Sequence, residues 1–128
     1  MSESLTLFHY WRSSASWRVR WGLAIKKVAY ESVAVDLLSK QEKEKTYLQR
    51  NPSGYVPCLM VGKEPLGESL AILEWLEENY PSPSFYSGNS ILRARIRQMA
   101  ETINSGLQPL QNLDVVRKIS DDKEKQAD

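Results

Sequence analysis

Three serines and an arginine stand close together near the start of the chain. Ser13, Ser14 and Ser16 supply hydroxyl groups at the entrance to an amphipathic segment, and Arg18 supplies a positive charge. A hydroxyl oxygen at a helix entrance accepts a hydrogen bond from the first backbone amides, and the amides left over favour an anion together with the helix dipole. The cluster therefore predicts either an anion site at a helix N-terminus or an ordinary helix cap.

A second candidate element is Val56-Pro57, at the start of an apolar run. Proline has no N–H to donate to a sheet ladder, so it occurs at edges, at bulges or at the first residue of a strand. If the Val56–Pro57 bond is cis, the backbone N–H and C=O of Val56 are left to pair with an extended peptide. If it is trans, Pro57 only ends a loop.

A third candidate is Glu68-Ser69, which precedes a strongly periodic helical segment. Ser69 is the predicted N-cap, and the amides behind it would suit a carboxylate. Glu68 would accept a hydrogen bond from an ammonium group. The alternative is a routine cap preceded by an exposed glutamate.

The chain contains one cysteine and one histidine, Cys58 and His9. This count excludes a disulfide framework within the chain, and we expect no metal site. Cys58 lies inside a predicted strand, so we expect a buried core residue and not a nucleophile. We expect a structural or surface role for His9.

The charges of the chain are almost balanced, with 17 basic and 16 acidic side chains and a net charge of +1. Such a balance gives no broad field to attract nucleic acid or an anionic membrane surface. No apolar run has the roughly 18–20 residues that span a bilayer, and the polar first residues do not resemble a signal peptide. We expect a cytoplasmic protein without nucleic-acid or membrane partners.

The hydropathy pattern predicts the order β-α-β-α-β-β-α over the first part of the chain. An early βαβ unit implies parallel strands, and the later pair of strands adds an antiparallel edge. The predicted strands cover residues 5–8, 32–37, 57–61 and 65–67, and the predicted helices run from about Ser16 to 27, over 39–50 and over 70–79.

The segment Pro81-Ser82-Pro83-Ser84 breaks this pattern and is typical of a linker. Helical periodicity alone follows it, over residues 91–107 and 110–118. A segment of this length cannot bury a core of its own, so these helices either pack on the first domain or begin a larger all-α domain. We expect the start of a larger all-α domain. The predicted divisions are a domain over residues 1–80, a linker over 81–86 and an incomplete helical domain over 87–128.

The stretch 13–20, Ser-Ser-Ala-Ser-Trp-Arg-Val-Arg, resembles the zeta class of glutathione transferases. The stretch 108–113, Gln-Pro-Leu-Gln-Asn-Leu, is similar to the same class, so the resemblance covers essentially the whole chain. It implies a thioredoxin-like domain with a mixed α/β sheet that binds glutathione, then the start of the all-α C-terminal domain. Ala15 replaces a cysteine of some members, and Tyr55 and Glu68 also depart from the usual pattern.

The resemblance also implies which residues form the site. It gives a cis Val56–Pro57 bond and assigns activation of the glutathione thiol to Ser13, Ser14 and Arg18. The implied contacts with glutathione are Ser13, Ser14, Ala15, Ser16, Trp17 and Arg18 at the thiol end, Val56, Pro57, Glu68 and Ser69 at the backbone and γ-glutamyl carboxylate, and Gln108, Asn112, Leu113 and Asp114 from the helical segment.

The activity that the resemblance implies is glutathione-dependent cis–trans isomerisation of maleylacetoacetate to fumarylacetoacetate, a step in tyrosine and phenylalanine catabolism. The substrate would be a small, conjugated dicarboxylic keto acid, and the protein a homodimer if its helical domain is complete. Three alternatives stay open: a transferase that conjugates electrophiles, a maleylpyruvate isomerase, and a truncated glutathione-binding module with little catalysis.

Overall fold

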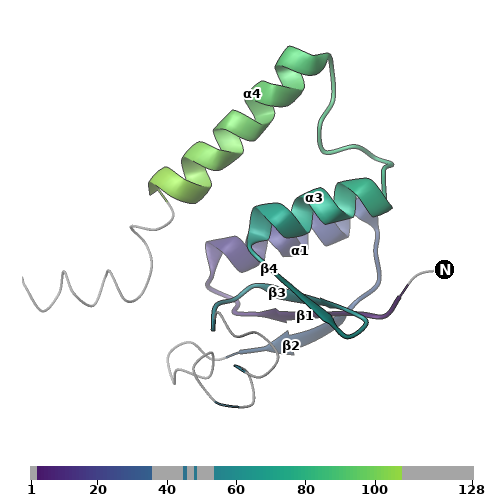
Figure 1. Ribbon diagram of the computed structural model, residues 1–128, viewed down its shortest axis with the longest axis vertical. Helices are drawn as coiled ribbons and strands as arrows, with labels where there is room; N and C mark the ends of the chain where they lie inside the picture. Colours follow the sequence, from purple (N-terminus) through teal and green to yellow (C-terminus); the bar gives the residue numbers. More distant parts are fainter. Residues whose placement is uncertain (1–2, 36–44, 46–47, 49–53, 108–128) are drawn as a thin grey trace, which may run out of the picture. The chain divides into compact units, whose positions relative to one another are not determined.

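Within the residues that the computed structural model describes (3–35, 45, 48 and 54–107), a four-stranded mixed sheet forms the centre of the first unit (Figure 1). Its strands are β1 (Leu5–His9), β2 (Glu31–Ala34), β3 (Cys58–Val61) and β4 (Glu64–Gly67), in the spatial order β2-β1-β3-β4. β1 pairs in parallel with β2 and antiparallel with β3, and β3 and β4 form an antiparallel hairpin. The predicted mixed sheet of a thioredoxin-like domain is confirmed.

Two helices, α1 (Ser14–Lys26) and α3 (Ser69–Asn79), lie together on one side of the sheet (Figure 1). The alternation of β1 sends Leu5 and Leu7 toward these helices, while Phe8 joins a smaller buried cluster with Val35 and Cys58. Fully burying one leucine side chain contributes about 1.5–3 kcal/mol, so the larger cluster is the main source of stability in this unit. That cluster consists of Leu5, Leu7, Val19, Leu23, Leu59, Ile72 and Leu76.

The helices α1 and α3 approach each other closely at Gly22. A Cβ atom at this position would overlap the Cδ2 atom of Leu73 and would lie 3.3 Å from the Cζ atom of Phe85. A side chain at position 22 would therefore displace Leu73, which glycine avoids at a cost in helix stability.

The observed bounds differ from the predicted ones by a few residues at most. α1 begins at Ser14, two residues before the predicted start, and ends at Lys26, where Lys27 caps it with a left-handed φ of 56°. β2 begins at Glu31, and the amide of Val35 beyond it donates to the His9 carbonyl (2.8 Å). Of the predicted helix over 39–50 the structure describes only residues 45 and 48, which are helical, and the end of the predicted strand over 32–37 lies outside the described residues.

The boundary between the two units of the chain falls between Phe85 and Tyr86. Residues 83–85, which the sequence assigned to a linker, are held in the first unit by Lys26 and Glu77. The Lys26 Nζ atom is buried and lies 2.5 Å from Glu77 Oε1 and 2.5 Å from the Pro83 carbonyl oxygen. It also lies 4.2 Å from the centroid of the Phe85 ring. The predicted division into a domain over residues 1–80, a linker over 81–86 and an incomplete helical domain over 87–128 stays a prediction.

The described part of the second unit is helical. α4 (Ser90–Glu101) is capped by Asn89, whose side chain accepts from the Leu92 amide (3.1 Å). The chain then continues as a π-helix, η2 (Thr102–Leu107), where the sequence predicted one α-helix over 91–107. The hydroxyl of Thr102 donates to the Gln98 carbonyl (2.9 Å), a side-chain bond that competes with the regular helix pattern. The predicted helix over 110–118 lies outside the described residues.

Candidate functional site

The three serines at the start of α1 have different environments. Ser13 is the N-cap, and its Oγ accepts a hydrogen bond from the Ser16 amide (3.1 Å). Ser16 is fully buried, and its own Oγ accepts from the Tyr10 amide (3.2 Å). Ser14 is exposed. Because the Ser13 hydroxyl accepts in its cap, its proton remains available to donate, so Ser13 and Ser14 are the two that can serve a ligand.

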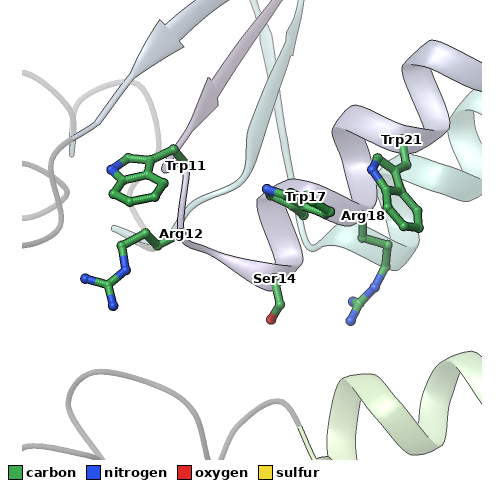
Figure 2. A pocket seen from close by; sticks show the side chains of 6 residues that line it. All are labelled: Trp11, Arg12, Ser14, Trp17, Arg18 and Trp21. Atoms are coloured by element: carbon green, nitrogen blue, oxygen red, sulfur yellow. The ribbon is translucent and has the colours of Figure 1, made fainter.

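A cavity of about 590 Å³ opens beside this helix start. Its lining residues are Trp11, Arg12, Ser14, Trp17, Arg18 and Trp21. In Figure 2, Trp11 and Arg12 stand on one side of Ser14, and Trp17, Arg18 and Trp21 stand on the other.

The side chains of the cavity combine aromatic surface with positive charge. The rings of Trp17 and Trp21 pack at a centroid distance of 5.3 Å, and the guanidinium of Arg12 lies 5.6 Å from the centroid of the Trp11 ring. Among the described residues, no acidic side chain lines the cavity. Indole rings stack on planar groups and guanidinium groups pair with carboxylates, so the cavity suits a planar anion.

Arg18 connects the start of α1 with the start of α3. One of its guanidinium nitrogens, Nη1, donates to Ser69 Oγ at 2.6 Å. Partial burial lowers the pKa of Arg18, but an arginine keeps its proton at neutral pH. The first and third candidate elements of the sequence therefore meet in one place.

The residue predicted to cap α3 is not the one that the structure shows. The N-cap is Glu68 and not Ser69, and Glu68 makes no side-chain cap hydrogen bond. Ser69 is the first helical residue, because its hydroxyl is engaged by the charged Arg18 donor instead. Glu68 has a left-handed φ of 64°, a conformation that costs a non-glycine residue about 1–3 kcal/mol and that occurs often at binding sites. The entrance of α3 thus has no side-chain cap, which suits a bound anion.

The Val56–Pro57 bond is cis, and this prediction is confirmed. Pro57 immediately precedes β3 and is buried, whereas Tyr55, two residues earlier, is exposed. A second cis bond, Ser82–Pro83, was not predicted.

Cys58 and His9 are both buried, as the sequence indicated for a core cysteine and a structural histidine. Burial raises the pKa of the Cys58 thiol to about 11, so it is protonated at neutral pH. The Nε2 atom of His9 lies 2.5 Å from Ser32 Oγ. Burial, with a contribution from the charge of Arg20, lowers the pKa of His9 and keeps the ring neutral.

The other predicted site residues divide into two groups. Ala15 and Ser16 face the interior, so their side chains do not line the cavity. The positions predicted in the helical segment, Gln108, Asn112, Leu113 and Asp114, lie outside the described residues.

Sequence reasoning missed three lining residues. Trp11, Trp21 and Arg12 were assigned no site role from the sequence, and the two indole side chains are 66% and 62% exposed. The four-residue spacing of Trp17 and Trp21, which places both on one helix face, was the available signal.

Two negative findings apply to the described part of the chain. It contains no group of three or more histidine, cysteine or acidic side chains arranged to hold a metal ion. None of its helices has the length and apolar character needed to cross a membrane.

Residues 3–78 match the family model described as "Glutathione S-transferase, N-terminal domain". The chain belongs to the glutathione S-transferase family. Among curated relatives, it is 47% identical over 119 residues to a maleylacetoacetate isomerase of Dictyostelium discoideum, covering 91% of this chain and 54% of that protein. Its similarity within the family is therefore to the zeta class and the maleylacetoacetate isomerases.

Solved structures of this glutathione S-transferase class have the same fold. A maleylacetoacetate isomerase from Anaeromyxobacter dehalogenans with bound GSH in its active site has a TM-score of 0.81 and 46% identity, over 94% of this chain and 58% of that one. The same protein has also been solved with dicarboxyethyl glutathione and citrate, with a TM-score of 0.79, 45% identity and coverage of 93% and 54%. A bacterial maleylpyruvate isomerase of the zeta class has a TM-score of 0.85 and 35% identity, with coverage of 88% and 53%. The chain spans about half the length of the relatives it matches.

Proposed function

We propose that this chain is the glutathione-binding part of a glutathione-dependent cis–trans isomerase that converts maleylacetoacetate to fumarylacetoacetate. The observation that carries the proposal is the Arg18–Ser69 hydrogen bond, which joins two helix entrances at a cationic, aromatic cavity. Glutathione is an anionic peptide with a carboxylate at each end and a thiol between them. The donors present, which are helix amides, serine hydroxyls and a guanidinium, fit such a molecule.

At the thiol end, the hydroxyl groups of Ser13 and Ser14 would donate hydrogen bonds to the sulfur. When bound, glutathione supplies a thiolate that adds to a conjugated double bond, permits rotation and leaves again. A free thiol has a pKa near 8.5, and lowering it by about two units requires about 2.7 kcal/mol. Two hydroxyl donors and the N-terminal dipole of α1 are sufficient for an effect of this size.

At the other end, the uncapped start of α3 would hold the γ-glutamyl carboxylate. Arg18 donates to Ser69 at this entrance, so we assign Arg18 to the carboxylate and no longer to activation of the thiol. Glu68 would accept from the γ-glutamyl ammonium group, and the Val56 backbone would pair with the cysteinyl part.

The cavity would hold the reacting acid. Arg12 and the indole rings offer a carboxylate partner and planar apolar surface to a conjugated dicarboxylic keto acid. The citrate-bound structure of the Anaeromyxobacter relative supports an acid in the corresponding site. We further propose a cytoplasmic homodimer whose active form includes a complete helical domain.

A second candidate function is maleylpyruvate isomerisation, which the similarity to the bacterial maleylpyruvate isomerase favours. Conjugation of electrophiles uses the same thiolate, and a binding module without turnover is consistent with the length of this chain. Turnover of the two maleyl substrates and of a general electrophile by the longest available form of the protein separates these functions.

The primary test is calorimetric titration of the full chain with glutathione, followed by an isomerisation assay on this chain and on a longer parent. We expect Ser69→Ala to weaken binding about tenfold, because a buried hydroxyl partner of Arg18 is lost. Ser87→Ala, at an exposed position, is the matched control and should bind as the wild type does. If the folded wild-type chain does not bind glutathione, the proposal is wrong.

A further inference from the structure

The loop between β1 and α1 carries one wall of the cavity, and three of the hydrogen bonds that it makes fix the backbone around Trp11. The Tyr10 amide donates to Ser16 Oγ (3.2 Å), and the Ser13 amide donates to the Tyr10 carbonyl (3.0 Å). The third bond comes from Arg20, whose Nη2 donates to the Trp11 carbonyl at 3.2 Å. Arg20 is not among the residues that line the cavity, and its hydrogen bond to the loop is exposed.

Arg20 also contacts the opposite wall. Its guanidinium carbon lies 5.6 Å from the centroid of the Trp17 ring, which in turn packs against Trp21. A planar guanidinium can stack on an indole and donate to a carbonyl at the same time, which an ammonium group does less well. One side chain therefore touches the backbone of one wall and the ring of the other.

The serines at the start of α1 depend on the loop that Arg20 holds. The Ser13 amide is bonded to the carbonyl of Tyr10, the residue just before Trp11. A shift of the Trp11 peptide therefore also shifts Ser13, which caps α1. Displacing a donor by about 1 Å is enough to weaken stabilisation of a charge severely.

We propose that Arg20 is a positioning residue for the thiol site, because it ties the Trp11 carbonyl to the Trp17 ring and so fixes Ser13 and Ser14 between the two walls. The inference rests on the proposed binding of glutathione. Arg20 acts through its neighbours and has no contact with the reacting groups.

The test is a pH titration of glutathione bound to the full chain, followed by the ultraviolet absorbance of the thiolate. Arg20→Met removes both the hydrogen bond and the stacking, and we expect the pKa of the bound thiol to rise by about one unit, a tenfold loss of thiolate at a given pH. Arg20→Lys keeps a donor and a charge without the planar fork, so its shift should be about half as large. Arg95→Met, at an exposed position on α4, is the matched control and should leave the thiol pKa unchanged.

A comparison at about 1 M salt separates positioning from a direct effect of charge. At that ionic strength the screening length is about 3 Å, so an effect of the Arg20 charge through solvent would vanish, whereas displaced serines would still raise the pKa. An unchanged pKa in folded Arg20→Met, or a shift that disappears in salt, overturns the inference. If Arg20→Met does not fold, an unchanged pKa in Arg20→Lys overturns it equally. If the folded wild-type chain does not bind glutathione, the proposed function is also wrong. This result is distinguishable from the others, because each of them is measured on bound glutathione.

Discussion

The three serines at the start of α1 have three different roles in the structure. Ser13 caps the helix, Ser16 is buried and fixes the preceding loop, and Ser14 faces the cavity. That serine hydroxyls gather at a helix start, where a hydroxyl oxygen accepts from a backbone amide, could be predicted from residue type and spacing. Which serine faces a ligand could not, because a one-residue step along a helix turns a side chain by about 100° and the sheet decides which direction is interior.

The first prediction concerns the serines that would activate the thiol. In a catalytically complete parent, replacing Ser13 and Ser14 together by alanine should reduce kcat by orders of magnitude and change glutathione affinity much less. The reason is that their hydrogen bonds strengthen as charge develops on sulfur, and so act mainly in the transition state. Steady-state kinetics with calorimetric binding measures both effects, and Cys58→Ser is the control. Full activity of the double mutant would refute the assignment.

The second prediction concerns Cys58, whose thiol is fully buried and has its pKa raised to about 11. At pH 8 only about a thousandth of such a thiol is ionised, and access is blocked as well. We expect negligible reaction with a thiol-specific chromogenic reagent in the native protein and one equivalent after denaturation. Rapid reaction of the native protein would contradict this burial.

At the scale of elements, α1 and α3 are joined at three successive levels. Arg18 bonds to Ser69 near the start of α3, Gly22 lies against Leu73, and the buried Lys26 pairs with Glu77. On each helix these positions are four residues apart, so the helices run in the same direction with matched i, i+4 rows. The sequence predicted both helices from their periodicity. It could not predict the pairing, because the spacing within each helix says nothing about which rows of different helices meet.

The third prediction is that Gly22→Ala destabilises the protein despite the better helix propensity of alanine. The added methyl group would overlap Leu73, and overpacking of this kind costs about 1–3 kcal/mol, against a propensity gain of about 1 kcal/mol. Chemical denaturation measures the free energy of unfolding. Gly67→Ala is the control, since a Cβ there meets no atom within 4 Å. Combining Gly22→Ala with Leu73→Val should recover part of the loss, and equal stabilities of Gly22→Ala and wild type would refute the close contact.

The fourth prediction concerns the pH dependence that Glu77 gives to stability. Partial burial raises the pKa of Glu77, but hydrogen bonds from Lys26, Ser84 and the Phe85 amide outweigh this, so the pKa lies below the ordinary value. A lowered folded-state pKa adds stability above the unfolded pKa of about 4.3, and this stability is lost as pH falls through the folded pKa. Wild type should therefore lose more stability than Glu77→Gln between about pH 5 and pH 3.

The matched control for this experiment is Glu78→Gln, at an exposed position on the same helix. At pH 7, Glu77→Gln should be the less stable protein by about 3 kcal/mol, because the buried Lys26 charge loses its partner. Parallel pH profiles for wild type and Glu77→Gln would show that the pair does not contribute.

At the scale of the whole molecule, the first unit contains the complete larger core within residues 5–76. The clamp by Lys26 and Glu77 extends this unit to Phe85, beyond the expected end at residue 80. The second unit has exposed apolar residues on α4, among them Ile91, Leu92 and Met99. This division is consistent with a chain that spans about half the length of its relatives.

The fifth prediction is that a chain ending at Phe85 unfolds cooperatively, with a Tm close to that of the first unit in the full chain. A chain ending at Tyr80 keeps the seven buried core residues and the Tyr80 ring that packs against them, but loses the Pro83 carbonyl and the Phe85 ring that contact Lys26. It should melt several degrees lower, since about 1 kcal/mol shifts the Tm of a small domain by about 4–8 °C. Thermal unfolding followed by circular dichroism compares the two, and equal Tm values would show that the segment after α3 does not belong to the first unit.

The sequence by itself determined the order of the described strands and helices, the mixed sheet and the buried cysteine, because these features depend on local periodicity and residue type. The family, and through it the cis Val56–Pro57 bond, came from the resemblance of the motifs, since the residues around Pro57 alone left cis and trans open. Only the tertiary structure decided that Arg18 reaches Ser69, that Glu68 and not Ser69 caps α3, and that Trp11 and Trp21 line a cavity. These contacts depend on how segments separated in sequence come together on one side of the sheet, and that geometry is set by packing of the whole core, which no local pattern encodes.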